Sequence, residues 1–384
     1  MRLSADPATT AALDTFADTV RITAIEAIPF ALPYRRAPKF ASGSVDRADN
    51  VLVRVHTDAG LVGHAEAQPR PYTYGETQTS IVEVVGGRLN DALTGVDPLR
   101  SELVAERCGR VAGNQVARGA VDLAVWDLIG QILGRPCHTL LGGFADGSAA
   151  AHMVSFAEPG AMAEDAIAIS DRLGVGTFKV KVGRDPDLDV AAVRAIRDAL
   201  PDAELYVDAN RGWSYENAVR AGDELADLGV RAIEEPISIE DRAGRLRLAD
   251  RWVVPLVGDE SCISLAHVDR ALEEGAVRMV SVKTARTGFT ESRRILDLCL
   301  ARNVPVVIGS QYEGALGTIA TIAFAAAFAA TAGRPAEITN FLDLGDDLVV
   351  SAPEIRDGRA TASAAPGLGV DIDEDRLNRY RLDN

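Results

Sequence analysis

The stretch that decides the fold is TFKVKVGRDPDLDVAAVRAIRDALPDAELYVDAN, which spans residues 177–210. It begins with the short apolar run TFKVKV and ends with a second one, AELYVD, and both are typical of buried strands. Between them, DLDVAAVRAIRDAL has the pattern of a helix. A strand, a helix and another strand in this order predict two parallel strands joined by a crossover helix.

The same alternation continues over roughly 200 residues after Gly143. Eight short apolar runs follow one another there: AAAHMVSF, TFKVKV, AELYVDAN, RAIEEP, VPLVGDES, RMVSVKT, VPVVIGS and AEIT. Eight parallel strands favour a closed barrel over an open doubly wound sheet. The GxGxxG turn that usually follows the first strand of such an open sheet is also absent. The sequence therefore predicts an α/β fold built on a TIM-like barrel.

The residues before the barrel have a different pattern. RITAIEAIPFAL predicts a strand, VLVRVHTDAGLVGHAEA predicts a β-hairpin, and AVDLAVWDLIGQILGRP predicts a helix that its Gly and Pro terminate. The Ala-rich stretch from Ala315 to Ala332 predicts a single buried helix. We expect four parts in chain order: an N-terminal extension (1–20), an α+β domain (21–145), the barrel (146–350) and a C-terminal segment that packs back on the α+β domain (351–384).

Composition and charge exclude several classes of function. With 47% hydrophobic residues and a mean hydropathy of +0.04, the 384-residue chain can build a large core. No apolar run reaches the ~18 residues that a membrane helix needs. The net charge of −16 argues against nucleic acid and anionic membranes as partners, but not against a small anion in a local cationic pocket. Four cysteines without paired spacing, and no signal-peptide pattern, fit a cytoplasmic protein.

Charged residues stand at the carboxyl ends of five consecutive predicted barrel strands. In chain order they are Lys179 and Lys181, Asp208 followed by Asn210, Glu234 and Glu235, Asp259 and Glu260, and Lys283. In such a barrel these strand ends open into one mouth, where the chemistry takes place. Asp208, Glu234 and Asp259 offer hard oxygen ligands suited to Mg²⁺, with neither His nor Cys among them to indicate zinc. The alternative is that each acid pairs with a neighbouring lysine or caps a helix.

The two lysines of the second strand are two residues apart, so both side chains leave the same face. At a separation of ~7 Å and an effective dielectric constant of ~20, their repulsion is ~2.4 kcal/mol, which predicts a pKa lowered from ~10.4 toward ~8.7. Such a lysine can act as a general acid or base near neutral pH. Lys283 would approach from the far side of the mouth. A carboxylate substrate held by Mg²⁺ could then carry enolate charge while a lysine moves the α-proton of the substrate.

Taken together, FKVKVG, YVDANRGW, IEEP, GDES and SVKTARTG resemble the enolase superfamily, and specifically its muconate lactonizing enzyme branch. The spacings also match this branch, with 26 residues from Asp208 to Glu234, 25 from Glu234 to Asp259 and 24 from Asp259 to Lys283. The resemblance covers about residues 21–384. The paired lysines exclude the mandelate racemase branch, because none of the five histidines supplies that branch's His–Asp dyad.

The resemblance implies an α+β capping domain over a (β/α)7β barrel, a bound Mg²⁺ for which Mn²⁺ could substitute, a small carboxylate substrate and a homo-oligomer. The site residues that it implies are the metal ligands Asp208, Glu234 and Asp259, the acid/base lysine Lys181 with Lys179 as its electrostatic partner, Lys283 on the opposite face, Glu337 on the eighth strand, and Asn210 and Glu260 as further candidates beside them. The capping loops PYRRAPKFASG and EAQPRPYTYGET would close on the substrate and present Arg35, Arg36, Lys39, Arg70, Tyr72 and Tyr74. One departure from the branch is Phe289, which follows Gly288 where a second Gly is usual.

The activity that the resemblance implies is cycloisomerisation of cis,cis-muconate to muconolactone in aromatic catabolism, through a metal-stabilised enolate that a lysine protonates. Alternatives within the branch are a racemase or epimerase of N-acyl amino acids or dipeptides, which would use Lys181 and Lys283 on opposite faces, and o-succinylbenzoate synthase. An epimerase would be expected to carry an Asp-x-Asp pair on the eighth strand, where this chain has Glu337 followed by Thr339. A lysine Schiff base in an aldolase-like barrel and a non-enzymatic binding role are the alternatives from other classes.

Overall fold

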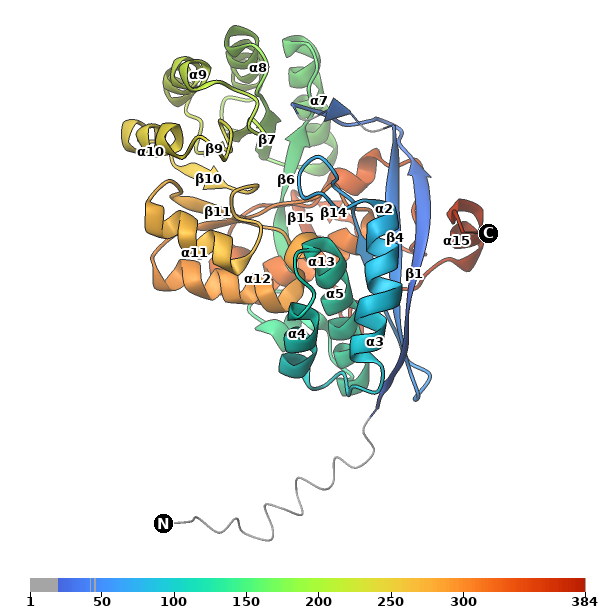
Figure 1. Cartoon of the computed structure of the whole chain (residues 1–384). Helices are drawn as coiled ribbons and strands as arrows, with labels where there is room; N and C mark the ends of the chain where they lie inside the picture. The colour runs from blue at the N-terminus through green and yellow to red at the C-terminus, as the bar shows by residue number, and fades with distance from the viewer. Residues whose placement is uncertain (1–19, 42, 45, 384) are drawn as a thin grey trace, which may run out of the picture.

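Eight parallel strands close into a barrel in the second part of the chain (Figure 1). The structure, a computed structural model, describes residues 20–41, 43–44 and 46–383, so the expected extension lies almost wholly outside the described residues. The barrel strands are β6 (Gly147–Val154), β7 (Thr177–Lys181), β8 (Glu204–Asp208), β9 (Ile233–Glu234), β10 (Leu256–Gly258), β11 (Met279–Val282), β12 (Val306–Ile308) and β13 (Ala336–Glu337). Since β13 pairs in parallel with β6, the ring is closed, and the predicted fold class is confirmed.

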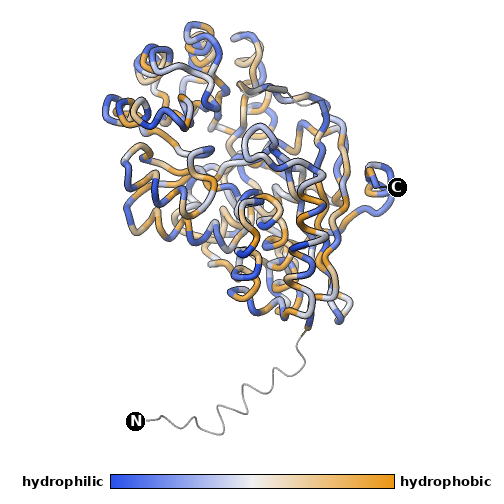
Figure 2. The backbone as a smooth tube through the Cα atoms, viewed as in Figure 1, coloured by the Kyte–Doolittle hydropathy of each residue, from blue (hydrophilic) through white to orange (hydrophobic). Residues whose placement is uncertain are grey.

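A helix follows each of the first seven barrel strands and covers the outside of the ring. These helices are α7 (Pro159–Leu173), α8 (Pro186–Ala199), α9 (Tyr215–Asp227), α10 (Arg242–Arg251), α11 (Leu265–Glu274), α12 (Thr284–Ala301) and α13 (Ala315–Ala327). Their starts follow local chemistry: the Asp185 side chain accepts from two backbone amides of α8, and Pro186 occupies its first turn. Figure 2 shows hydrophobic and hydrophilic residues alternating along these helices, as expected for elements with one buried face.

The prediction of a single helix from Ala315 to Ala332 is wrong. The stretch forms two helices, α13 and α14 (Ala329–Ala332), because the backbone of Phe328 is extended, with φ −126° and ψ 144°. Leaving the helix at this point places the Phe328 ring edge-on against Phe324, at 5.1 Å between centroids, and under the guanidinium of Arg293 at 5.1 Å. Ring packing therefore overrides the helical propensity of the Ala-rich sequence.

The N-terminal domain is an antiparallel sheet covered by helices. Its three strands are β1 (Ile22–Pro33), β4 (Arg47–Thr57) and β5 (Val62–Ala67), and β4 and β5 form the predicted hairpin. The helical elements after them are α2 (Gln78–Glu83), η1 (Val84–Leu89, π-helical), α3 (Asn90–Leu93), α4 (Ser101–Gly109), α5 (Gln115–Leu133) and α6 (Cys137–Leu141). As predicted, α5 ends at a glycine, Gly134, whose φ is +63°.

Helix α5 joins this domain to the barrel. It packs on β5 on one side and on α12 on the other. The contact with α12 requires a glycine, because a Cβ on Gly119 would lie 2.6 Å from the carbonyl oxygen of Arg286. Asp122 of the same helix accepts from the backbone amides of Phe289 and Thr290, at 2.7 and 2.9 Å. Phe289, which stands where the branch usually has a second glycine, thus places a buried ring between the two domains, where it stacks on Phe324.

The C-terminal residues return to both domains. Strand β15 (Arg359–Thr361) extends the barrel sheet by pairing antiparallel with β6, and β14 (Ile355–Arg356) pairs antiparallel with β15. Helix α15 (Glu374–Tyr380) lies outside β1 (Figure 1). The amide of Leu382 donates to the carbonyl oxygen of Pro29 at 2.8 Å. The remaining short elements are β2 (Lys39–Phe40), β3 (Gly43–Ser44) and the 3₁₀ helix η2 (Asn340–Asp343). In the described part of the chain, no helix is long and apolar enough to cross a bilayer, and all four cysteines are buried free thiols.

Candidate active site

A cavity opens at the carboxyl ends of the barrel strands, under one loop of the N-terminal domain. It is lined by Arg70, Thr73, Tyr74, Met153, Lys179, Lys181, Asn210, Asp259, Glu260, Lys283, Ser310, Gln311, Tyr312, Glu337 and Asn340. The whole sequence contains four lysines, and three of them line this cavity. Arginine carries the positive charge almost everywhere else in the chain. Lysine, the cation that can lose its proton in a buried site, is thus concentrated in this cavity.

Lys179 lies at the centre of a group of buried carboxylates. Its Nζ is 3.1 Å from Asp208 Oδ2, 2.8 Å from Glu234 Oε1 and 3.0 Å from Glu337 Oε1. Burial alone would lower the pKa of Lys179, but these three carboxylates raise it well above its ordinary value. The lowered pKa expected from the pair of lysines is therefore wrong for Lys179, because three nearby anions outweigh one neighbouring cation.

Lys181 and Lys283 reach the cavity from opposite sides. They belong to the ends of β7 and β11, which are four strands apart in a closed ring of eight. Lys181 Nζ donates to Asp208 Oδ2 and to Asn210 Oδ1, both at 2.7 Å. Lys283 Nζ donates to Asp259 Oδ2, and although burial acts against it, Asp259 raises the pKa of Lys283 above its ordinary value. A substrate between these lysines would have an ammonium group on each side.

The three candidate metal ligands stand at the ends of adjacent strands, but lysines lie between them. Within the described residues, no three His, Cys, Asp or Glu side chains form a ready-made metal cluster. Asp208, Glu234 and Asp259 each bond to a lysine instead, which is the alternative that the sequence left open. These residues nevertheless fit a divalent cation. Glu234 Oε2 is buried without a hydrogen-bond partner among the described residues, and such an orphaned hard oxygen suits Mg²⁺.

A set of buried side chains that sequence reasoning missed fixes the carboxylates in place. Arg286 Nη1 donates to Asp259 Oδ1 at 2.6 Å and to Tyr74 Oη at 3.1 Å. The Tyr206 hydroxyl donates to Glu337 Oε1 at 2.9 Å. Tyr206 could have been found, because it precedes Asp208 by two residues and therefore faces the same side of the strand. For Arg286 the sequence gives no comparable signal.

Two further predicted residues adjoin the carboxylates. Asn210 Nδ2 donates to Glu260 Oε1 at 3.2 Å, and its backbone, at φ +40°, turns so that its amide donates to Asp208 Oδ1 at 2.9 Å. Burial, together with the charges of Asp259, Glu235 and Asp208, raises the pKa of Glu260 to about 7. Glu235, which follows Glu234, is turned away to accept from the backbone amides of Asp259 and Ser261.

Of the six capping-loop candidates, the structure brings two to the cavity, Arg70 and Tyr74. Tyr72 is 76% exposed and lies outside the lining. The others hold the loop on the barrel: Arg36 pairs with Asp165 and Asp343, Arg35 donates to Gly345 O, and the carbonyl oxygen of Lys39 accepts from the amide of Phe156. Sequence alone could not separate loop anchors from lining residues, because their partners lie more than 100 positions away.

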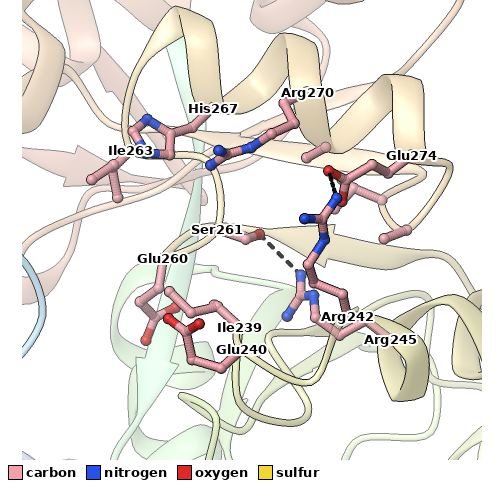
Figure 3. A pocket seen from close by; sticks show the side chains of 13 residues that line it. Ile239, Glu240, Arg242, Arg245, Glu260, Ser261, Ile263, His267, Arg270 and Glu274 are labelled. Atoms are coloured by element: carbon pink, nitrogen blue, oxygen red, sulfur yellow. Dashed lines mark hydrogen bonds and ion pairs between the residues drawn. The ribbon is translucent and has the colours of Figure 1, made fainter.

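A second hollow lies on the outer side of Glu260, between α10 and α11 (Figure 3). Several of its charged side chains are already paired: Arg242 with Glu274, and Arg245 with Glu235 and with Ser261 Oγ at 2.9 Å. It contains none of the three lysines and none of the three candidate metal ligands. The barrel mouth therefore remains the candidate active site.

Comparisons with known proteins agree with this architecture. Residues 24–142 match the family model "Mandelate racemase / muconate lactonizing enzyme, N-terminal domain", and residues 161–376 match "Enolase C-terminal domain-like". The chain is 44% identical to a muconate lactonizing enzyme from Mycobacterium smegmatis whose structure was solved with muconolactone. That match covers 94% of this chain and 100% of the other, with a TM-score of 0.93.

Other relatives have different activities. A muconate cycloisomerase from Acinetobacter lwoffii is 30% identical, over 96% of this chain and 97% of its own length. A dipeptide epimerase from Cytophaga hutchinsonii, solved with Mg and the dipeptide D-Ala-L-Val, is 28% identical over 94% of this chain and 98% of its own, with a TM-score of 0.86. Overall likeness at this level therefore does not separate cycloisomerases from epimerases, and the side chains of the cavity have to decide.

Proposed function

The chain belongs to the mandelate racemase/muconate lactonizing enzyme family of the enolase superfamily, and from this premise we propose that it is a muconate cycloisomerase. It would convert cis,cis-muconate to muconolactone, an intramolecular addition within aromatic catabolism. The observation that carries the proposal is the charge of the cavity. Three lysines and Arg70 line it, and each lining carboxylate already has a donor: Lys283 for Asp259, Asn210 for Glu260, and Tyr206 for Glu337.

This charge distribution favours a dianion over a dipeptide. An epimerase that binds a dipeptide has to hold its ammonium group, and the sequence would place acids for that purpose at the end of the eighth strand. Here Glu337 is engaged by Tyr206 and Lys179, and the next outward position is Thr339, whose hydroxyl is 2.8 Å from His152 Nδ1. The muconolactone-bound relative at 44% identity supports the same choice.

Asp208, Glu234 and Asp259 would hold the Mg²⁺, which when bound supplies positive charge that stabilises an enolate. In the reaction, an oxygen of one substrate carboxylate forms a bond to the carbon β to the other carboxylate. The π electrons move to the α-carbon, and the Lys181 ammonium donates a proton there. Lys181 regains its proton from solvent, so one proton is taken up per turnover. The Lys283 ammonium group would stabilise the negative charge of the reacting substrate from the side opposite Lys181, while Arg286 keeps Asp259 in place.

A substrate panel tests the proposal. With Mg²⁺, the wild-type protein is expected to consume cis,cis-muconate, followed by loss of its ultraviolet absorbance, and to catalyse no α-deuterium exchange of dipeptides or N-succinyl amino acids. EDTA should abolish turnover, and borohydride should trap no substrate on a lysine. The reverse pattern, exchange of a dipeptide without loss of muconate, would establish the epimerase. That rival also has an observation in its favour, because Lys181 and Lys283 stand on opposite sides of the cavity, as two-base chemistry requires.

Arg70 offers a test of the capping loop. Its guanidinium donates to the carbonyl oxygens of Pro69 and Gln311 at the edge of the cavity. Arg70→Ala is expected to raise KM for muconate about 10-fold while kcat changes less than about 3-fold, because the residue contacts the substrate from another domain than the proton-transfer groups. Arg35→Ala is the matched control, because the Arg35 guanidinium donates to Gly345 O outside the cavity lining, and this variant should leave KM unchanged. A fall in kcat at constant KM would instead place Arg70 in the chemical step.

A further inference from the structure

The side chain of Gln311 is a buried amide that lacks partners. The residue follows β12, lines the cavity and is 3% exposed. Neither Oε1 nor Nε2 has a hydrogen-bond partner among the described residues. Leaving a buried polar group unpaired costs about 1–3 kcal/mol, and most buried polar groups in native structures have a hydrogen-bond partner. A ligand in the cavity would supply the missing partner.

Hydrogen bonds hold the backbone of the loop around Gln311 in place. The backbone nitrogen of Gln311 donates to Glu313 Oε2 at 2.6 Å, and the backbone carbonyl oxygen of Gln311 accepts from the Arg70 guanidinium. Tyr312, the next residue, has a left-handed backbone with φ +65°, held by its amide's bond to Ser310 Oγ at 2.8 Å. Such conformations in residues other than glycine persist where surrounding contacts impose them, and they cluster at functional sites.

The neighbouring polar groups, by contrast, are satisfied within the protein. Ser310 Oγ donates to Glu313 Oε2, and Asn340 Nδ2 donates to Ser310 Oγ at 2.8 Å. In this loop, Gln311 is therefore the polar side chain that makes no hydrogen bond to another described residue. Because Lys181, Lys283 and Arg70 line the same cavity, the group that meets its Nε2 should be an anion.

We infer that Gln311 determines specificity by donating from Nε2 to the substrate carboxylate that lies away from Asp208, Glu234 and Asp259. This inference rests on the proposed function and adds to it the residue that recognises the second carboxylate of a dicarboxylate. Gln311 is a binding residue and takes no part in proton transfer. The signal for it in the sequence is GSQYEG, where a polar amide follows the seventh strand.

The test separates binding from stability and from chemistry. Adipate, a saturated six-carbon dicarboxylate that cannot lactonise, is titrated by calorimetry against Mg²⁺-loaded protein, and muconate kinetics are measured in parallel. Gln311→Met is expected to weaken adipate binding and raise KM for muconate about 10- to 100-fold, with kcat within about 3-fold. Gln311→Glu, which puts a negative charge in the same place, should weaken both further. The thermal midpoint of Gln311→Met should equal or exceed that of the wild type, because an unpaired amide has been removed.

Gln131→Met is the matched control. This amide is paired, to Val62 O at 2.9 Å and Asp127 Oδ2 at 3.1 Å, and lies outside the cavity lining. It should lose stability and keep its adipate affinity, the opposite of Gln311→Met. If the wild-type protein turned over muconate and Gln311→Met bound adipate as tightly as the wild type, the inference about Gln311 would be overturned and the proposed function would stand. A wild-type protein that neither binds adipate nor turns over muconate would overturn the proposed function as well.

Discussion

Glu234→Gln is expected to lower kcat/KM for muconate by about a thousand-fold or more and to remove tight binding of Mn²⁺, used as a probe for Mg²⁺. Glu234 is fully buried at the end of β9, with Oε1 bonded to Lys179 at 2.8 Å and Oε2 without a partner. Glutamine keeps the volume but replaces the charge, and sets an NH₂ group or a neutral oxygen where a cation should bind. Asp208→Asn and Asp259→Asn should behave in the same way.

Two measurements check this prediction independently. Turnover is followed at Mg²⁺ concentrations set by a chelator, and Mn²⁺ binding is followed by electron paramagnetic resonance in the absence of substrate. Asp189→Asn is the matched control: it is equally buried but bonds to the amides of Gly183 and Arg184, away from the cavity. It should lose stability and retain Mn²⁺ binding. Near-normal activity and Mn²⁺ affinity in any of the three cavity variants would show that this residue is not a ligand.

The barrel could be predicted because its signal is local. Each apolar run is short, ends in a turn or a charge, and is separated from the next by a helical segment, so strand, order and parallel direction follow from the sequence alone. The polar residues at the strand ends could be placed for the same reason. Lys179, Lys181, Asp208 and Lys283 all lie at the mouth because parallel strands present their carboxyl ends to one side.

The electrostatics could not be predicted in this way, because they depend on residues far apart in the chain. From the sequence, repulsion by the lysine two positions away predicts a lowered pKa for Lys179. In the folded chain, Glu337 on the strand that closes the barrel lies beside the Lys179 ammonium group and helps to raise the pKa of Lys179. The unpaired side-chain amide of Gln311 and the break in the helix at Phe328 likewise depend on the folded surroundings of these residues, which no periodicity shows. The sequence thus predicts which strand ends carry charged groups to the mouth of the barrel, and the structure is needed to show which of these groups pair.

The second large effect concerns the proton. Lys181→Ala is expected to abolish formation of muconolactone, whereas Lys283→Ala should slow it and leave α-proton exchange of muconolactone in D₂O detectable. Addition to muconate requires one proton, delivered to one face of the enolate. Lys181 is held toward the mouth by Asp208 and Asn210, while Lys283 is bound to Asp259 on the other side. Lys283 would therefore act mainly through its charge.

Deuterium decides between the two lysines. Muconolactone formed in D₂O should carry deuterium on one face of its α-carbon, the face turned toward Lys181. Lys39→Ala is the natural control, because Lys39 is the one lysine of the four outside the cavity lining and should leave rate and labelling unchanged. Exchange that survives Lys181→Ala but is lost in Lys283→Ala would reverse the assignment. Exchange at the α-carbon of an amino acid that needs both lysines would show two-base chemistry, and the opposed ends of β7 and β11 would then serve an epimerase.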